Sequence, residues 1–143
     1  MVSVVAGQTE ISGQLNYKYE KKKRILIIEQ EDDLREILRL SLELFTDWEV
    51  LTASSDTQGL DIATTQQPGV IVVSTSMSKL KDCHIIEDIK NHHLTHNIPV
   101  ILMADRLRLA DQCQFSQQGV AAVINTGDNP RDLASSIDRI LNF

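Results

Sequence analysis

The chain has 143 residues, of which 42% are hydrophobic, and it carries a net charge of −6 at pH 7. This length supports one domain with a buried core and is too short for two ordinary domains. The negative charge argues against nucleic acid as the main ligand, because binding to phosphate backbones depends on clustered lysine and arginine. No apolar run reaches the roughly 20 residues that cross a bilayer, and no secretory signal pattern is present, so we expect a soluble, cytoplasmic protein.

The residues that could bind a metal through sulfur or imidazole are sparse. Cys83 and Cys113 are too widely spaced for a disulfide framework or a metal cluster, and we expect both to be buried as small hydrophobic residues. His92, His93 and His96 stand close together, but no cysteine or acidic residue accompanies them at close spacing. We therefore expect a solvated loop there and no metal site.

The first part of the chain, residues 1–23, has neither helical nor alternating hydrophobic periodicity. It mixes glycine, serine and glutamine with scattered apolar residues and leads into a basic run at 21–24. We interpret residues 1–23 as a flexible N-terminal tail and the basic run as a solvated flank before the first strand. The apolar residues between Val2 and Tyr19 leave open that part of the tail docks on a partner or on the domain itself.

From residue 24 onward, short apolar runs alternate with longer amphipathic segments, which is typical of βαβ units around a buried parallel sheet. Several of the runs are continuously aliphatic, as expected for central strands that helices cover on both faces. The five predicted strands contain Ile25–Ile28, Val50–Leu51, Val70–Val73, Val100–Met103 and Ala121–Ile124.

Helical periodicity fills the intervals between these runs. Apolar residues from Leu34 to Leu44 and from Leu133 to Leu141 recur about every 3.6 positions. Further helices are predicted at Asp56–Thr65, Leu80–Asn91 and Leu107–Gln118. Five strands alternating with five helices predict a (βα)5 flavodoxin-like, doubly wound α/β fold with a five-stranded parallel sheet, in one domain that covers residues 24–143.

In sheets of this kind, ligands bind beyond the carboxyl ends of the strands. The segments there, and the order and spacing of the apolar runs, resemble the receiver domain of response regulators, the CheY-like family. The resemblance covers about residues 23–143 and rests on RILIIEQEDDLREIL at 24–38, WEVLTA at 48–53, PGVIVV at 68–73, IPVIL at 98–102 and Gly119 before the last strand.

The resemblance also implies a site. In the family, an acidic pair after the first strand holds Mg²⁺, an aspartate after the third accepts the phosphoryl group, and a hydroxyl residue and a lysine follow the fourth and fifth. The matching positions here are Glu29, Gln30, Ser74, Ala104 and Thr126, and the aromatic switch position in the last strand is Val123. A neutral serine cannot form an acyl phosphate, so the resemblance implies a pseudo-receiver that lacks the phosphoacceptor aspartate.

We therefore expect no enzyme activity, no cofactor and no metal, and a role as a non-phosphorylatable protein–protein interaction module in a two-component-type phosphorelay or regulatory assembly. Nucleic acid and membranes are not expected as partners. Receivers commonly bind partners through the fourth helix, fifth strand and fifth helix, which here implies a face at about Arg106–Gln118, Val120–Thr126 and Arg131–Leu141 that includes Arg106, Arg108 and Arg131. The tail is the other candidate for binding a protein partner, and a homodimer stays open.

Two alternative functions remain. A small-molecule or flavin-binding domain of the same topology would use the hydroxyl-rich loops Ser74–Ser76 and Thr126–Gly127, although the chain lacks a glycine-rich phosphate loop and has few aromatic residues. A receiver with unorthodox phosphorylation would hold Mg²⁺ through Glu29 and Glu31 and use the same serine as acceptor. The acidic run Glu29–Asp33 is otherwise explained by helix-start charge and capping.

Overall fold

The computed structural model of the chain describes residues 23–76, 79, 84–105, 107–125 and 130–141, with the backbone alone described at 130, 131 and 141. Within this part, five strands form one sheet in the order β3-β2-β4-β5-β6, and every neighbouring pair is parallel. The strands are β2 (Arg24–Ile28), β3 (Glu49–Ala53), β4 (Val70–Thr75), β5 (Val100–Ala104) and β6 (Ala122–Asn125). The predicted five-stranded parallel sheet is therefore confirmed.

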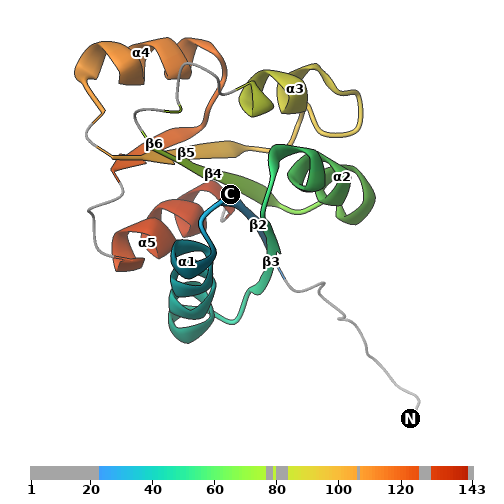
Figure 1. The fold of residues 1–143 in the computed structure, drawn as a ribbon, viewed down its shortest axis with the longest axis vertical. Coiled ribbons are helices and arrows are strands. Elements are labelled where there is room, and N and C mark those ends of the chain that lie inside the picture. Colours follow the sequence, from blue (N-terminus) through green and yellow to red (C-terminus); the bar gives the residue numbers. More distant parts are fainter. Residues whose placement is uncertain (1–22, 77–78, 80–83, 106, 126–129, 142–143) are drawn as a thin grey trace.

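A helix follows each strand in the described residues. The helices are α1 (Asp32–Phe45), α2 (Asp56–Gln66), α3 (Ile85–Asn91), α4 (Leu109–Gln117) and α5 (Pro130–Leu141). Figure 1 shows α1 and α5 on one face of the sheet and α2, α3 and α4 on the other. Helices on both faces of a parallel sheet confirm the doubly wound, flavodoxin-like fold.

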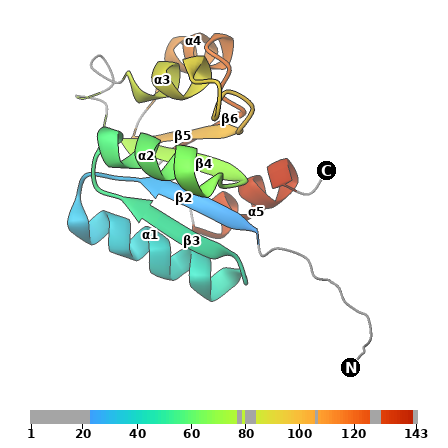
Figure 2. The ribbon, with the colours of Figure 1, turned by 90° about the vertical axis from the view of Figure 1, so that its right-hand side faces the viewer.

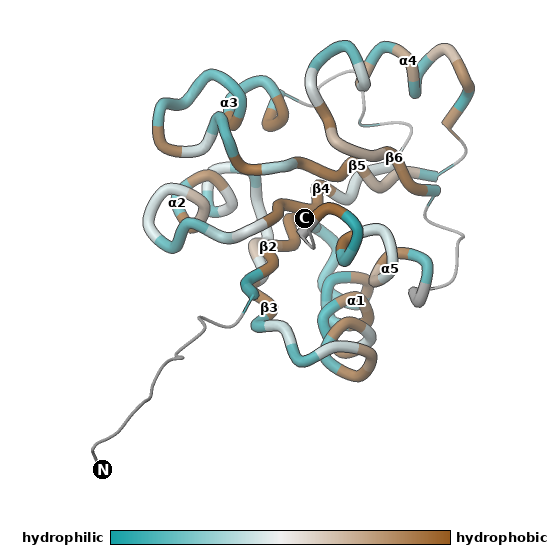
Figure 3. The backbone as a smooth tube through the Cα atoms, turned by 180° about the vertical axis from the view of Figure 1, so that it is seen from behind, coloured by the Kyte–Doolittle hydropathy of each residue, from teal (hydrophilic) through white to brown (hydrophobic). Residues whose placement is uncertain are grey.

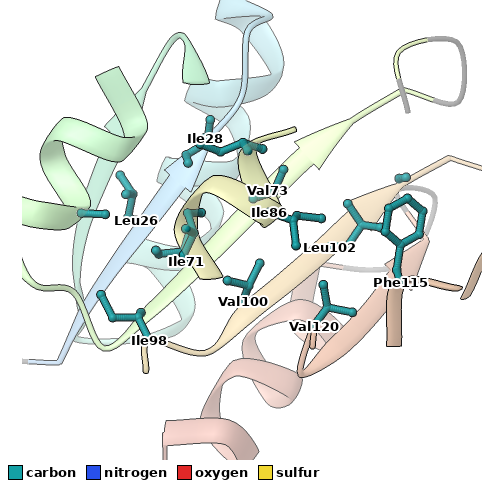
Figure 4. Packing of buried hydrophobic residues seen from close by; sticks show 14 of the residues in the cluster. Leu26, Ile28, Ile71, Val73, Ile86, Ile98, Val100, Leu102, Phe115 and Val120 are labelled. Atoms are coloured by element: carbon teal, nitrogen blue, oxygen red, sulfur yellow. The ribbon is translucent and has the colours of Figure 1, made fainter. Parts of the chain in front are cut away.

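The continuous aliphatic runs are explained by this two-sided cover, because successive residues of a strand point to opposite faces. Leu26 and Ile28 of β2 belong to the core cluster under α2, α3 and α4, whereas Ile25 and Ile27 belong to the cluster under α1 and α5. Figure 4 shows the first cluster, with Phe115 of α4 among the strand residues. Each strand therefore supplies side chains to both cores.

Two residues with positive φ lie where helices end. Gln67 ends α2 in a left-handed conformation with φ 49°, and Gly119, with φ 95°, lies between α4 and β6. The first and last of the three shorter predicted helices agree with α2 and α4 to within two residues at each end. The predicted helix Leu80–Asn91 begins later, at Ile85, and residues 80–83 lie outside the described residues.

One burial prediction is wrong, and another lies outside the described residues. Cys113 is exposed, because α4 turns Phe115 toward the core and leaves this cysteine on its outer side. Cys83 and residues 1–22, the greater part of the predicted tail, lie outside the described residues. Among the helices that the structure describes, none is both long and apolar enough to cross a bilayer.

Candidate functional site

The strand order places one crevice between β2 and β4. The chain passes from β2 to β3 on one side and then to β4 on the other side of β2. Open α/β sheets bind ligands at the carboxyl ends of strands where the order reverses in this way. Ile28 of β2 pairs with Val73 of β4, so the following residues, Glu29 and Ser74, meet at that point.

Glu29 and Ser74 contact each other directly. Both are buried, each with an exposed fraction of 7%. The Oγ of Ser74 donates a hydrogen bond of 2.6 Å to Oε1 of Glu29, and the backbone N of Glu31 donates one of 2.8 Å to Oε2. Both carboxylate oxygens thus have a donor, as a buried carboxylate requires. This hydrogen bond joins the carboxyl ends of β2 and β4.

The loop from β2 to α1 is held by an arginine of the helix. A guanidinium nitrogen of Arg35 donates to the carbonyl oxygen of Glu29 at 2.9 Å, and another lies 2.5 Å from the Asp32 carboxylate. Asp32 and Asp33 occupy the first turn of α1, where negative charge is favoured. Glu31 is the N-cap residue but makes no side-chain capping bond. Helix-start charge is present, whereas side-chain capping by Glu31 is not.

The side chain of Gln30 contacts Lys79, a residue that no sequence pattern marks. The Nζ of Lys79 donates to Oε1 of Gln30 at 3.1 Å, across the exposed side of the crevice. Lys79 lies beyond the end of β4, in a connection without a recognisable motif, and only its place in the fold shows that it reaches β2. The structure therefore adds a cationic side chain at Gln30, the residue after Glu29.

The neighbouring strands present few polar groups to the crevice. Ala104 at the end of β5 is fully buried, pairs with Thr75 and offers only a methyl group. Asn125 at the end of β6 accepts a hydrogen bond of 3.4 Å from the backbone N of Leu107. Val123 is partly buried against the cluster under α2, α3 and α4. Thr126 lies outside the described residues.

The serines after β3 start a helix. The Oγ of Ser55, the N-cap of α2, accepts a hydrogen bond of 3.1 Å from the backbone N of Gln58. The side-chain oxygen of Gln58 in turn accepts one of 2.7 Å from the backbone N of Ser54. The Ser55 hydroxyl therefore has a structural role, because it satisfies a backbone N–H in the first turn of α2.

Of the three arginines predicted on the partner-binding face, one can be described in full. Arg108 is exposed at the N-cap of α4, and its Nε lies 3.2 Å from the Asp111 carboxylate. This guanidinium holds the pKa of the Asp111 carboxyl below its usual range. Arg106 lies outside the described residues, and only the backbone of Arg131, in the first turn of α5, is described.

The three clustered histidines lie in the connection between α3 and β5. This connection is at the amino ends of the strands, whereas Glu29 and Ser74 are at the carboxyl ends. The rings of His92 and His93 are stacked with centroids 4.9 Å apart, and Nδ1 of His92 accepts a hydrogen bond from the backbone N of Leu94. Over the part of the chain that the structure describes, no three His, Cys, Asp or Glu side chains are grouped to hold a metal ion.

Comparison with known proteins places these features in a family. The family model described as the response regulator receiver domain matches residues 25–138. The chain is 25% identical over 120 residues to the probable transcriptional regulator ycf27 of Cyanophora paradoxa, an alignment that covers 84% of this chain and 48% of that protein. It is 24% identical over 119 residues to the phosphate regulon transcriptional regulatory protein PhoB of Pseudomonas aeruginosa, covering 83% and 52%. The chain spans about half the length of these curated relatives.

Solved structures show the same fold. A response regulator receiver domain protein from Clostridium thermocellum superposes with a TM-score of 0.73 and 28% identity, over 84% of this chain and 94% of that one. The chemotaxis protein CheY4 of Vibrio cholerae superposes with a TM-score of 0.75 and 16% identity, over 85% and 100%.

Proposed function

Because the chain belongs to the response regulator receiver domain family, we propose that it acts as a non-phosphorylatable pseudo-receiver, a protein–protein interaction module in a two-component-type signalling or regulatory assembly. The observation that carries this proposal is the buried hydrogen bond from Ser74 to Glu29 at the carboxyl ends of β4 and β2. It occupies the place where the family resemblance puts the phosphoacceptor and the metal-binding pair.

The Ser74–Glu29 contact opposes phosphorylation on electrostatic grounds. A phosphoryl group on Ser74 would carry about −1.5 to −2 charges at neutral pH. It would stand at hydrogen-bond distance from the Glu29 carboxylate, in a position that is 7% exposed. Two like charges at that separation in a buried site cost free energy unless a cation lies between them. The alternative function, a receiver that uses Ser74 as the phosphoryl acceptor, is therefore disfavoured.

The donors at the implied metal positions do not fit Mg²⁺. This ion prefers an octahedral set of oxygen ligands that includes carboxylates. Here one carboxylate, that of Glu29, already accepts two hydrogen bonds, and the neighbouring Gln30 supplies a neutral amide oxygen bonded to the ammonium of Lys79. A positive charge at that place repels a divalent cation.

The remaining positions also lack the groups that would neutralise a transferred phosphoryl group. The methyl group of Ala104 donates no hydrogen bond, and Val123 offers no polar group for a coupled switch. A modification shifts a conformational equilibrium only through interactions that differ between two states. Without those interactions, the partner-binding state is the resting state of the domain.

We place the partner on the surface formed by α4, β6 and α5, with the N-terminal tail as the second candidate. Arg108 supports this surface because its guanidinium is exposed at the beginning of α4. The curated relatives named above are described as transcriptional regulators, and the aligned residues cover about half of each one. In our proposal this domain serves the same kind of assembly by binding a separate protein.

The proposal is tested by capturing partners with the full chain and measuring their affinity. Charge reversal at Arg106, Arg108 or Arg131 should each cost roughly 1–2 kcal/mol of binding free energy, and a small phosphodonor should change nothing. Arg39→Glu is the matched control, because Arg39 also makes exposed ion pairs but lies on α1, on the other face of the sheet. If all three reversals leave binding intact while substitutions between Val2 and Tyr19 abolish it, the interface lies on the tail.

A further inference from the structure

One helix exposes a row of large apolar side chains. Ile37, Leu40 and Leu44 of α1 are each more than half exposed, with 79% for Leu44, and Phe45 at the helix end is 43% exposed. Residues three and four apart share one face of a helix, so Ile37, Leu40 and Leu44 form a stripe. Figure 3 shows hydrophobic positions along α1, and the stripe faces away from the core residues Leu38 and Leu42. An exposed apolar row of this kind is a candidate interaction site.

The described chain begins at Lys23, near the end of α1 that carries Leu44. The carbonyl oxygen of Lys23 accepts a hydrogen bond of 2.8 Å from the backbone N of Glu49, the first residue of β3. Only residues 46–48 separate β3 from the end of α1. The Nζ of Lys23 also lies 4.0 Å from the Asp138 carboxylate of α5, the helix that packs beside α1. Figure 2 shows the start of β2 and the end of α1 at the same edge of the sheet.

We propose that residues 1–22, which lie outside the described residues, dock on this stripe of α1 through their apolar side chains. The segment carries Ile11, Leu15, Tyr17 and Tyr19, whose side chains match an apolar surface. Four residues of extended chain, from Tyr19 to Lys23, span about 13 Å, while the stripe from Ile37 to Leu44 is about 10 Å long. The chain is long enough to lay these residues along α1.

Charge favours this occupant over a second copy of the protein. Residues 1–22 contain three lysines and two glutamates, a side-chain charge of +1, whereas α1 contains four acidic residues and two arginines, a charge of −2. Two α1 helices facing each other would bring like charges together. Lys21 and Lys22, which follow the apolar residues, and Lys18 between Tyr17 and Tyr19 would instead lie near Glu43 and Asp47 at the end of α1. Covalent attachment further favours the tail, because its effective concentration is about millimolar.

A spin label tests the proposal in the full chain. The nitroxide is attached at Ser12→Cys in a Cys83→Ser/Cys113→Ser background, and methyl NMR signals are recorded with the label oxidised and reduced. The methyl signals of Ile37 and Leu44 should lose most of their intensity. Leu94 and Leu109 are the controls, because they are also exposed but lie away from α1, in the α3–β5 connection and at the start of α4.

Three further results test whether the tail docks on α1. In Leu40→Gln/Leu44→Gln, which changes exposed positions only, the effect on Ile37 should largely disappear. Equal broadening of Ile37 and Leu109, or none at all, would overturn the proposal. Broadening that requires a second, separately labelled copy of the chain would assign the stripe to a dimer and would also overturn it. None of these outcomes depends on whether Ser74 accepts a phosphoryl group.

Discussion

The hydroxyl of Ser74, the second-last residue of the central strand β4, donates a 2.6 Å hydrogen bond to the carboxylate of Glu29, which follows β2. The two residues are 45 positions apart in the chain and meet because β2 and β4 are parallel neighbours. Under the proposed function, this contact satisfies a buried carboxylate without a cation.

Removing the hydroxyl should destabilise the domain. Ser74→Ala leaves Oε1 of Glu29 buried without its donor, which costs about 1–3 kcal/mol of unfolding free energy. Urea denaturation measures this loss. The same substitution in a Glu29→Leu background should cost clearly less, because no buried carboxylate then loses a partner. Equal costs in the two backgrounds would show that the hydrogen bond contributes little.

A close approach in the core makes Gly59 necessary. A Cβ built at this α2 residue would lie 2.4 Å from Cδ1 and 2.7 Å from Cγ1 of Ile28, whose side chain is buried. Gly59→Ala should therefore destabilise the protein by about 1–3 kcal/mol, although alanine favours a helix. In an Ile28→Val background the loss should shrink, since Cδ1 is gone. Thermal denaturation of the four proteins tests this, and an unchanged loss would count against the steric cause.

Asp56 should titrate above its usual range. Burial, and then the nearby charge of Asp88, raise the pKa of the Asp56 carboxyl above 3.8. The folded state then binds this proton more tightly than the unfolded state, so the free energy of unfolding falls as pH rises from the ordinary pKa through the raised one. A carboxyl ¹³C titration should show the raised midpoint, and Asp88→Asn should lower it. A midpoint at or below 3.8 would refute the burial argument.

Mg²⁺ should not stabilise the protein. A ligand that binds only the folded state raises the melting temperature according to its concentration relative to its Kd. Because Gln30 and Ser74 supply neutral donors, and Lys79 adds a positive charge beside Gln30, low millimolar MgCl₂ should act no differently from NaCl at equal ionic strength. A Mg²⁺-specific rise in melting temperature would show that the remaining acidic residues still form a cation site.

Much of the fold could be predicted from the sequence, because its strands are buried on both faces. Continuous aliphatic runs such as Val70–Val73 occur where helices cover both sides of a sheet, and this pattern needs no knowledge of the register. The helix α4 was harder, since Phe115 is its one buried residue in the described structure. The burial of Cys113 was mispredicted for this reason. The predicted domain boundary at residue 24 stays a prediction.

The location of the site could be predicted from the sequence, but its hydrogen bonds could not. The rule that parallel strands end at one edge locates Glu29, Ser74 and Ala104 together. The hydrogen bond between the first two depends on the register of β2 and β4, which the sequence does not specify. The contact of Lys79 with Gln30 depends on the path of the connection after β4. Neither contact leaves a local pattern in the chain.

The most direct test of the central claim is the intact mass of the full chain after incubation with acetyl phosphate and Mg²⁺, recorded at neutral pH so that a labile phosphoryl group survives. A receiver domain that has the family's aspartate serves as the positive control for the phosphodonor. We predict no mass increase for this chain, because Ser74 is buried against the Glu29 carboxylate. A stoichiometric increase of one phosphoryl group would contradict the proposal that this domain is a pseudo-receiver.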